Sequence, residues 1–140
     1  MLSHWHRDHS GGILEALTHI NAARQEDSEH SQKGAVKVDL HPNRPIARGI
    51  APPPKYDKVI ARLPEDPTFR EIEELGGLVD LHDEPHTVAG GTVFISGEIP
   101  RLIPFEEGLL GGVRWFTHPA TSVGEWVGEP VRCTFRLRDG

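Results

Sequence analysis

The stretch His4-Trp5-His6-Arg7-Asp8-His9-Ser10-Gly11-Gly12 places three histidines and one aspartate directly before a pair of glycines. Neutral imidazole and carboxylate groups are ligands that zinc and neighbouring divalent metals prefer. In an extended segment the side chains of residues i and i+2 point to the same side. We therefore expect His4 and His6 to bind one metal ion together, and Trp5 to point the other way, into the interior.

The second half of this stretch turns into a helix. Asp8 and His9 lie where the backbone changes direction, so they can be aimed at a second point close to the first. A helix that begins after Gly12 brings partial positive charge to its N-terminus, which favours an anionic group there. The pattern suits two metal ions and a bridging water whose pKa falls from 15.7 to roughly 7. The competing interpretation is a solvated histidine-rich segment that binds adventitious metal.

The periodicity of apolar residues predicts a mixture of helices and strands. Ile13, Leu14, Leu17 and Ile20 form a helical stripe that fades around Arg24. A second, shorter helix is expected to start at Asp66-Pro67 and to end at Gly76-Gly77. Strands are expected at 35–40, at 78–81, on either side of Gly90-Gly91 (87–89 and 92–95) and at 131–137. The expected fold class is α/β (mixed α+β).

Composition narrows the classes of function. The chain of 140 residues has 36% hydrophobic residues, 15 glycines, 12 prolines and a net charge of -6. We see no basic stripe, so no nucleic acid partner is expected. No apolar run has the length of a membrane span, and the single cysteine, Cys133, allows no intrachain disulfide. These features favour a cytoplasmic protein with a small-molecule substrate and no membrane partner. Five prolines make residues 41–57 a loop or extended segment.

The motif His4-x-His6-x-Asp8-His9 resembles the hallmark of the metallo-β-lactamase fold superfamily. Ser96-Gly97-Glu98-Ile99-Pro100-Arg101 and the following Pro104-Phe105-Glu106 are similar to a segment of one branch of it. That branch is commonly named as similar to 7,8-dihydropterin-6-methyl-4-(β-D-ribofuranosyl)-aminobenzene-5'-phosphate synthase. A strand followed by His41-Pro42 fits the same branch. The resemblance extends over about residues 2–127, and its first motif is the specific one.

This resemblance implies an αββα sandwich of two mixed sheets with helices outside. It implies that His4 and His6 ligate a first metal, that Asp8 and His9 ligate a second, and that Asp8 also orients the attacking water. The metal would be zinc, with iron or manganese as alternatives, and up to two ions would bind. Arg101 would lie at the substrate mouth and pair with a phosphate or carboxylate, although a surface arginine beside a proline turn is the competing interpretation.

The sequence also departs from the family pattern. The strands that normally precede the motif are absent, and so are the later histidine ligands; Cys133 is followed by threonine and does not form the expected Cys-Ser-His segment. Residues 131–140 depart from the family pattern as well. We therefore expect residues 1–140 to form a single, incomplete domain, an internal piece of one about twice this length.

The missing ligands could be replaced by the other histidines, which are His19, His30, His41, His82, His86 and His118. His19 fits an exposed helix position, and His30 lies in a charged loop. His82 and His86 flank Asp83-Glu84-Pro85, a turn with the composition of a metal site, yet a solvated turn is the favoured interpretation.

The leading hypothesis is a metal-dependent hydrolase-like protein of metallo-β-lactamase fold. Its metal-bound hydroxide would attack an ester, amide or phosphoester. The alternative is an inactive fragment, or a metal-binding and interaction module that a partner completes. In that case exposed sheet edges would favour self-association.

Overall fold

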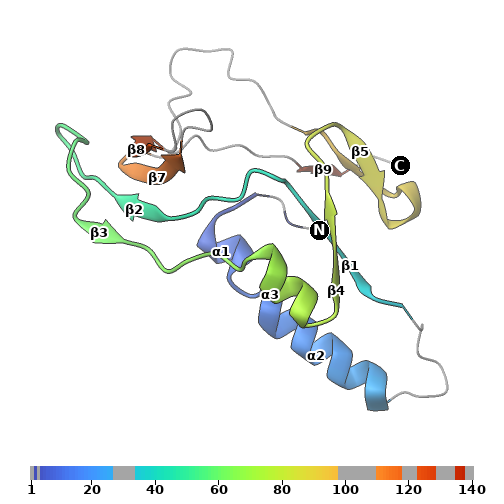
Figure 1. Cartoon of the computed structure of the whole chain (residues 1–140). Helices are drawn as coiled ribbons and strands as arrows, with labels where there is room; N and C mark the ends of the chain where they lie inside the picture. The colour runs from blue at the N-terminus through green and yellow to red at the C-terminus, as the bar shows by residue number, and fades with distance from the viewer. Residues whose placement is uncertain are drawn as a thin grey trace.

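The computed structural model describes residues 2, 4–26, 34–97, 110–117, 123–128 and 135–137. The helices in these ranges are α1 (Arg7–Ser10), α2 (Ile13–Glu26), α3 (Phe69–Glu74) and the 3-10 turn η1 (Ala89–Gly91). The strands are β1 (Val36–Leu40), β2 (Arg48–Ile50), β3 (Ala61–Arg62), β4 (Gly77–Leu81), β5 (His86–Val88), β6 (Val93–Ile95), β7 (Gly112–Thr117), β8 (Gly124–Gly128) and β9 (Phe135–Leu137). Figure 1 shows their arrangement.

The described strands form three small sheets. β1 and β4 make a parallel pair in which Val36 lies opposite Gly77 and Leu40 opposite Leu81. A four-stranded antiparallel sheet has the order β3-β2-β7-β8, and a three-stranded antiparallel sheet has the order β5-β6-β9. The predicted mixed α/β class is thereby confirmed. The two facing sheets that the resemblance implies stay an expectation.

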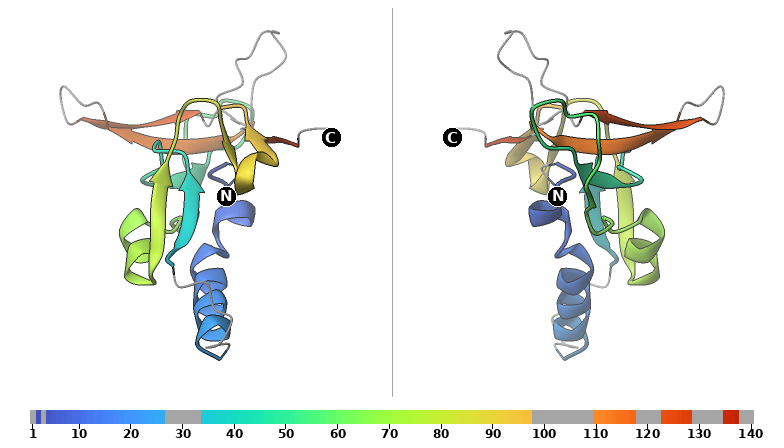
Figure 2. Two further views of the ribbon diagram at one scale, coloured as in Figure 1. Left: turned by 90° about the vertical axis from the view of Figure 1, so that its right-hand side faces the viewer. Right: turned by 90° about the vertical axis from the view of Figure 1, so that its left-hand side faces the viewer.

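The main core lies between the helices and the parallel pair. Helices α2 and α3 lie side by side on one face of β1 and β4 (Figures 1 and 2). The buried residues of this core are Trp5, Leu17, Val38, Leu40 and Ile72. Trp5 therefore packs inward, as the alternation around it predicted, and its indole nitrogen donates to the carbonyl of His41 at 2.9 Å.

Helix α3 begins at Phe69, later than the predicted start at Asp66-Pro67. Thr68, and not Asp66 or Pro67, is its N-cap, because the Thr68 hydroxyl accepts from the amide of Glu71. The Glu71 carboxylate in turn accepts from the Thr68 amide at 2.8 Å, which completes a capping box. These hydrogen bonds from Thr68 lower the pKa of the Glu71 carboxyl. Asp66 is thereby left free to bind elsewhere, and it does so inside the molecule.

Most predicted elements occur close to their expected bounds. The first helix continues to Glu26, the strands at 36–40 and 77–81 form, and η1 joins β5 to β6 at the predicted hairpin. The proline-rich segment contains a short strand, β2, which the prediction of a loop or extended segment did not specify. Strands β7 and β8 were not predicted. No helix among the described residues has the length and apolarity needed to cross a membrane.

Candidate functional site

The histidine motif lies where an extended segment enters helix α1. His6 has an extended backbone (φ -118°, ψ 149°), and its carbonyl accepts from the amides of His9 at 2.9 Å and Ser10 at 2.7 Å. These two bonds fold the chain back within one turn. The side chain of His9 is thereby returned toward those of His4 and His6.

His4 contacts both of the other motif histidines. Nε2 of His4 lies 3.1 Å from Nδ1 of His6, and the ring centroids of this pair are 4.6 Å apart. The rings of His4 and His9 are closer still, with centroids 4.1 Å apart. The predicted same-side placement of His4 and His6 is therefore found. His9 lies against His4 and beside Asp8, so the prediction that Asp8 and His9 bind a second ion stays a prediction.

Asp8 lies at the solvent side of this cluster. Its carboxylate is 79% exposed and stands 3.5 Å from Nε2 of His9. Three imidazoles with an adjacent carboxylate match the ligand types of a zinc site. These potential ligand atoms lie close together but do not surround a common point.

Burial keeps two of these imidazoles in the form that binds metal. It lowers the pKa of His4, and the neighbouring His6 and His9 lower it further. It also lowers the pKa of His6, with a second contribution from the positive charge of Arg48. Both pKa values therefore lie below the usual 6.5, and both rings are neutral at pH 7. Neutral imidazole carries the lone pair that a metal needs.

A buried ion pair holds the motif helix in place. Arg48 on β2 donates to Asp66 through Nη2 at 2.7 Å and through Nε at 3.0 Å. Both side chains are almost completely buried, at 3% and 2% exposure. The hydroxyl of Ser10 in α1 donates to the same carboxylate. The residue that follows His9 is thus fixed to a charged pair inside the molecule.

Two further arginines hold the segment that carries Asp66. Arg7 of the motif donates to the carbonyl of Glu65 at 2.6 Å, and Arg44 donates to the carbonyls of Asp66 and of Pro67, the latter at 2.8 Å. The motif is therefore connected to residues 65–67 by the hydrogen bond from Arg7 to the Glu65 carbonyl and by the one from Ser10 to the Asp66 carboxylate.

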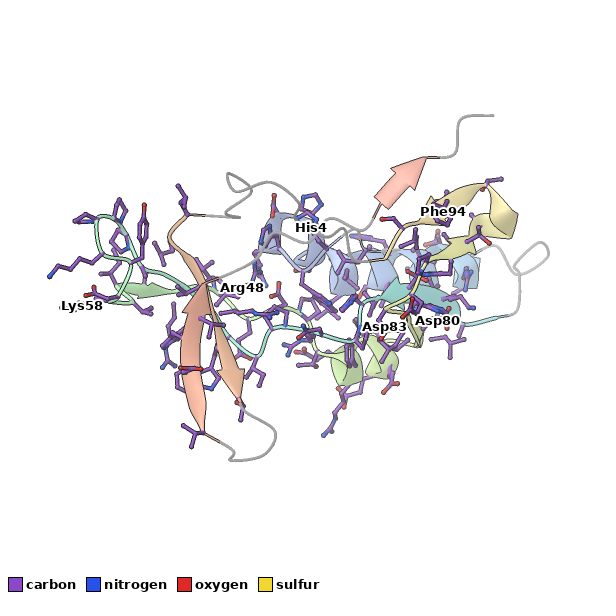
Figure 3. All side chains as sticks on the ribbon, turned by 90° about the horizontal axis from the view of Figure 1, so that it is seen from above. His4, Arg48, Lys58, Asp80, Asp83 and Phe94 are labelled. Carbon is purple, nitrogen blue, oxygen red and sulfur yellow. The ribbon has the colours of Figure 1, made fainter. Side chains whose placement is uncertain are left out.

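A second cluster of potential ligands lies elsewhere. Asp39 of β1, His82 after β4 and His86 of β5 each offer one ligand atom, and these atoms lie within 4.8 Å of one another. This group could hold a metal ion. It is the one set of three or more histidine, cysteine, aspartate or glutamate residues in the described ranges that meets this criterion. Figure 3 shows Asp80 and Asp83, which flank His82, well apart from His4.

The structure corrects the prediction of a solvated turn at His82 and His86. The His86 side chain is 17% exposed, its Nε2 lies 2.8 Å from Oδ2 of Asp39, and its Nδ1 lies 2.9 Å from the carbonyl of Glu84. The two imidazole rings stack, with centroids 4.0 Å apart. Parallel pairing of β1 with β4 brings Asp39 beside this turn.

Charge around the second cluster favours positive charge on the His86 ring. Burial lowers the pKa of His86, but hydrogen bonds to Glu84 and Asp39 and the charge of Asp39 and Asp80 outweigh it, so this pKa is raised above 6.5. Hydrogen bonds from Lys37 and then from His82 lower the pKa of Asp80. The second cluster is therefore anionic around its histidines, unlike the motif.

The remaining predicted site residues have different placements. His19 is exposed on α2, 3.7 Å from Glu15, as expected. Nδ1 of His41 accepts from the amide of Asn43 at 3.0 Å. The predictions for Arg101, His30, His118 and Cys133 fall outside the described residues.

The signal that sequence reasoning missed is the position of Asp39. An aspartate near the carboxyl end of a buried strand is unusual, and parallel strands end at the same edge of a sheet.

Comparison with family models, with curated proteins and with solved structures finds no match to this chain.

Proposed function

We propose that the chain is a metal-dependent hydrolase-like protein of metallo-β-lactamase type, acting on an ester, amide or phosphoester. The observation that carries this proposal is the contact among His4, His6 and His9 at the start of α1, with Asp8 beside them. His4 and His6 would hold one divalent ion, zinc being the best match to the donor set, and Asp8 and His9 would bind a second ion. When bound, such an ion supplies a Lewis acid that makes a water nucleophilic at neutral pH.

The residues of the chain have separate tasks in this proposal. His4 and His6 present neutral imidazoles, because burial lowers the pKa of both. The exposed carboxylate of Asp8 can accept a hydrogen bond from an incoming water and orient it. The Arg48–Asp66 pair, through Ser10, keeps the turn from shifting when a ligand binds.

Metal binding tests this proposal directly. We expect the untagged chain to bind Zn²⁺ and the His4→Ala/His6→Ala variant to bind at least one equivalent less, as measured by isothermal titration calorimetry. Affinity at the motif should be retained from pH 7 through pH 6.5 and should fall only at lower pH, because burial holds the pKa of both rings below 6.5 and protons compete below those pKa values. Hydrolysis of p-nitrophenyl esters and of bis(p-nitrophenyl) phosphate should depend on the same two histidines.

His19→Ala is the matched control, because His19 is an exposed helix residue outside both clusters. Its stoichiometry should equal that of the unmodified chain. If the His4→Ala/His6→Ala variant binds as much zinc as the His19→Ala variant, the motif is not a metal site and the hydrolase proposal is wrong.

A second candidate function is an interaction module completed by a partner, and the parallel pair β1–β4 favours it. Parallel sheets are usually covered on both faces and have several strands. Here only two described strands pair in this way, and Leu78 and Leu81 on β4 are 53% and 44% exposed. Another chain could extend this sheet and cover these leucines.

Self-association through β4 would be the simplest form of this module. We expect light scattering at rising concentration to give masses above the 15.5 kDa of one chain. Leu78→Lys should shift the population toward the monomer, because a buried lysine is costly at such an interface. Ile60→Lys, at a residue that is 65% exposed near β3, should have no such effect. A monomer at every concentration would exclude this form of the proposal.

A further inference from the structure

Asp39, His82 and His86 lie at the junction of two sheets. Asp39 belongs to β1, His82 directly follows β4, and His86 opens β5. We propose that these three residues form a structural Zn²⁺ site, separate from the histidine motif, which fixes the β5–β6 hairpin to the parallel pair β1–β4. This inference does not depend on hydrolase activity.

The spacing of the donor atoms suits a tetrahedral ion. Ligands about 2.1 Å from a tetrahedral zinc stand about 3.4 Å from one another. Oδ2 of Asp39 lies 2.8 Å from Nε2 of His86 and 3.9 Å from Nε2 of His82. These separations lie on either side of that value. All three ligand atoms lie within 4.8 Å of one another.

The types of donor select the metal. Two imidazole nitrogens and one carboxylate are the set found in zinc sites, whereas Ca²⁺ and Mg²⁺ require oxygen ligands. Asp39 supplies one carboxylate, and its side chain is only 8% exposed. Asp80 approaches Nε2 of His82 to 3.0 Å and also pairs with Lys37 at 2.9 Å. Asp80 thus pairs with both Lys37 and His82, and Asp39 supplies the carboxylate of the group of three.

The hydrogen bonds of His86 indicate how the ion would be held. Its Nδ1 and Nε2 both face acceptors, the Glu84 carbonyl and the Asp39 carboxylate. A protonated imidazole has two N–H groups and satisfies both acceptors, and zinc would take the place of the proton at Nε2. With zinc at Nε2, the remaining N–H donates to Glu84, which fixes the ring in the manner of the outer hydrogen bonds found around metal-binding histidines.

Space for an ion lies next to these donors. A recess of about 10 Å³ is lined by Asp39 and His82 of the cluster and by neighbouring residues that include Glu84. That volume corresponds to about one water molecule. A recess of this size does not accommodate a substrate, which favours a structural role.

The site would join parts that no described backbone pairing joins. Among the described strands, β5 pairs with β6 and β6 pairs with β9, but none of these pairs with β1 or β4. The carboxylate of Asp39 and the ring of His86 therefore provide a side-chain link between the two sheets. A shared metal ion would replace this single hydrogen bond with two coordinate bonds, and would add a third from His82.

The test uses the full chain with the motif removed. In the His4→Ala/His6→Ala background, Zn²⁺ titrated into chelator-treated protein should bind at one equivalent and raise the melting temperature. Adding His86→Gln should abolish that equivalent and that rise. The loss of zinc affinity should exceed the roughly 10- to 100-fold loss that follows removal of a residue hydrogen-bonded to a metal ligand. Asp83→Asn, a change at an exposed carboxylate in the same turn, should keep both effects.

Two results would overturn the inference. One is that the His86→Gln chain still binds the zinc equivalent, and the other is that zinc raises its melting temperature as much as it does without this substitution. If circular dichroism shows that the His86→Gln chain is unfolded, His82→Gln replaces it, since His82 is 36% exposed and disturbs less packing. Co²⁺ then serves as a spectroscopic probe. Visible bands of a tetrahedral ion in the motif-free background, lost in His82→Gln, support the site, and bands that persist refute it. Failure of the motif proposal would appear separately, as equal stoichiometry in the unmodified chain and the motif-free background.

Discussion

Arg48→Met should destabilise the chain by about 3–5 kcal/mol, because it leaves the carboxylate of Asp66 buried without its cation. Asp66 is 2% exposed, so water cannot replace the two hydrogen bonds that Arg48 donates. The hydroxyl of Ser10 would remain as a donor to it, but a single neutral donor does not compensate a full charge. The loss would be a large share of the total stability of an ordinary domain, about 5–15 kcal/mol.

Urea denaturation followed by circular dichroism measures this effect. With a slope of about 2 kcal/mol/M, a loss of 4 kcal/mol lowers the midpoint by about 2 M. The Arg48→Met/Asp66→Leu variant should recover much of the lost stability, because replacing a whole buried pair by apolar side chains is often neutral.

Arg70→Ala provides the surface comparison. Arg70 pairs with Glu74 at 2.7 Å, but its side chain is 85% exposed, so its removal should cost well under 1 kcal/mol. If Arg48→Met costs no more than Arg70→Ala, the buried pair does not organise residues 65–67 and the motif helix.

Ile72→Ala should cost about 2–5 kcal/mol, the second largest effect that we expect. Ile72 lies on α3, is fully buried, and belongs to the core between the helices and the parallel pair. Packing there is tight: a Cβ atom added at Gly77 would come within 2.7 Å of the Ile72 side chain. A cavity at this point has little surrounding chain that can move to fill it.

A graded series makes this prediction specific. Ile72→Val should cost about 0.5–1.5 kcal/mol, because a single methylene group is lost. Ile60→Ala changes the same residue type at a position that is 65% exposed and should alter the free energy of unfolding by less than about 0.5 kcal/mol. If Ile60→Ala and Ile72→Ala lower the free energy of unfolding equally, then α3 does not contribute to the core through Ile72.

Local features of the sequence predicted the regular elements well. The apolar stripe of residues 13–24 and the alternation of residues 35–40 each lie within one short continuous segment. The helix and the strand therefore follow from periodicity alone. The near contact of His4 with His6 was also predictable, because it needs only the two-residue repeat of an extended chain. Trp5, between them, follows the same rule.

The contacts that the sequence did not reveal join distant residues. Arg48 meets Asp66 only after α3 has been placed, and Asp66 had been interpreted as the start of that helix. Asp39 meets His86 across 47 positions, through the pairing of β1 with β4. Such contacts depend on tertiary packing, which periodicity does not encode.

The parallel pairing of β1 with β4 also sets the order in which the chain can fold. Val36 finds its partner at Gly77, 41 positions later (77 − 36), so the loop between them must close before any contact of this sheet forms. During synthesis, α2 can form early while the apolar side chains of Val38 and Leu40 have no strand beside them. A chaperone that recognises short apolar extended segments would therefore meet β1 first, and its release would coincide with the emergence of residues 77–81.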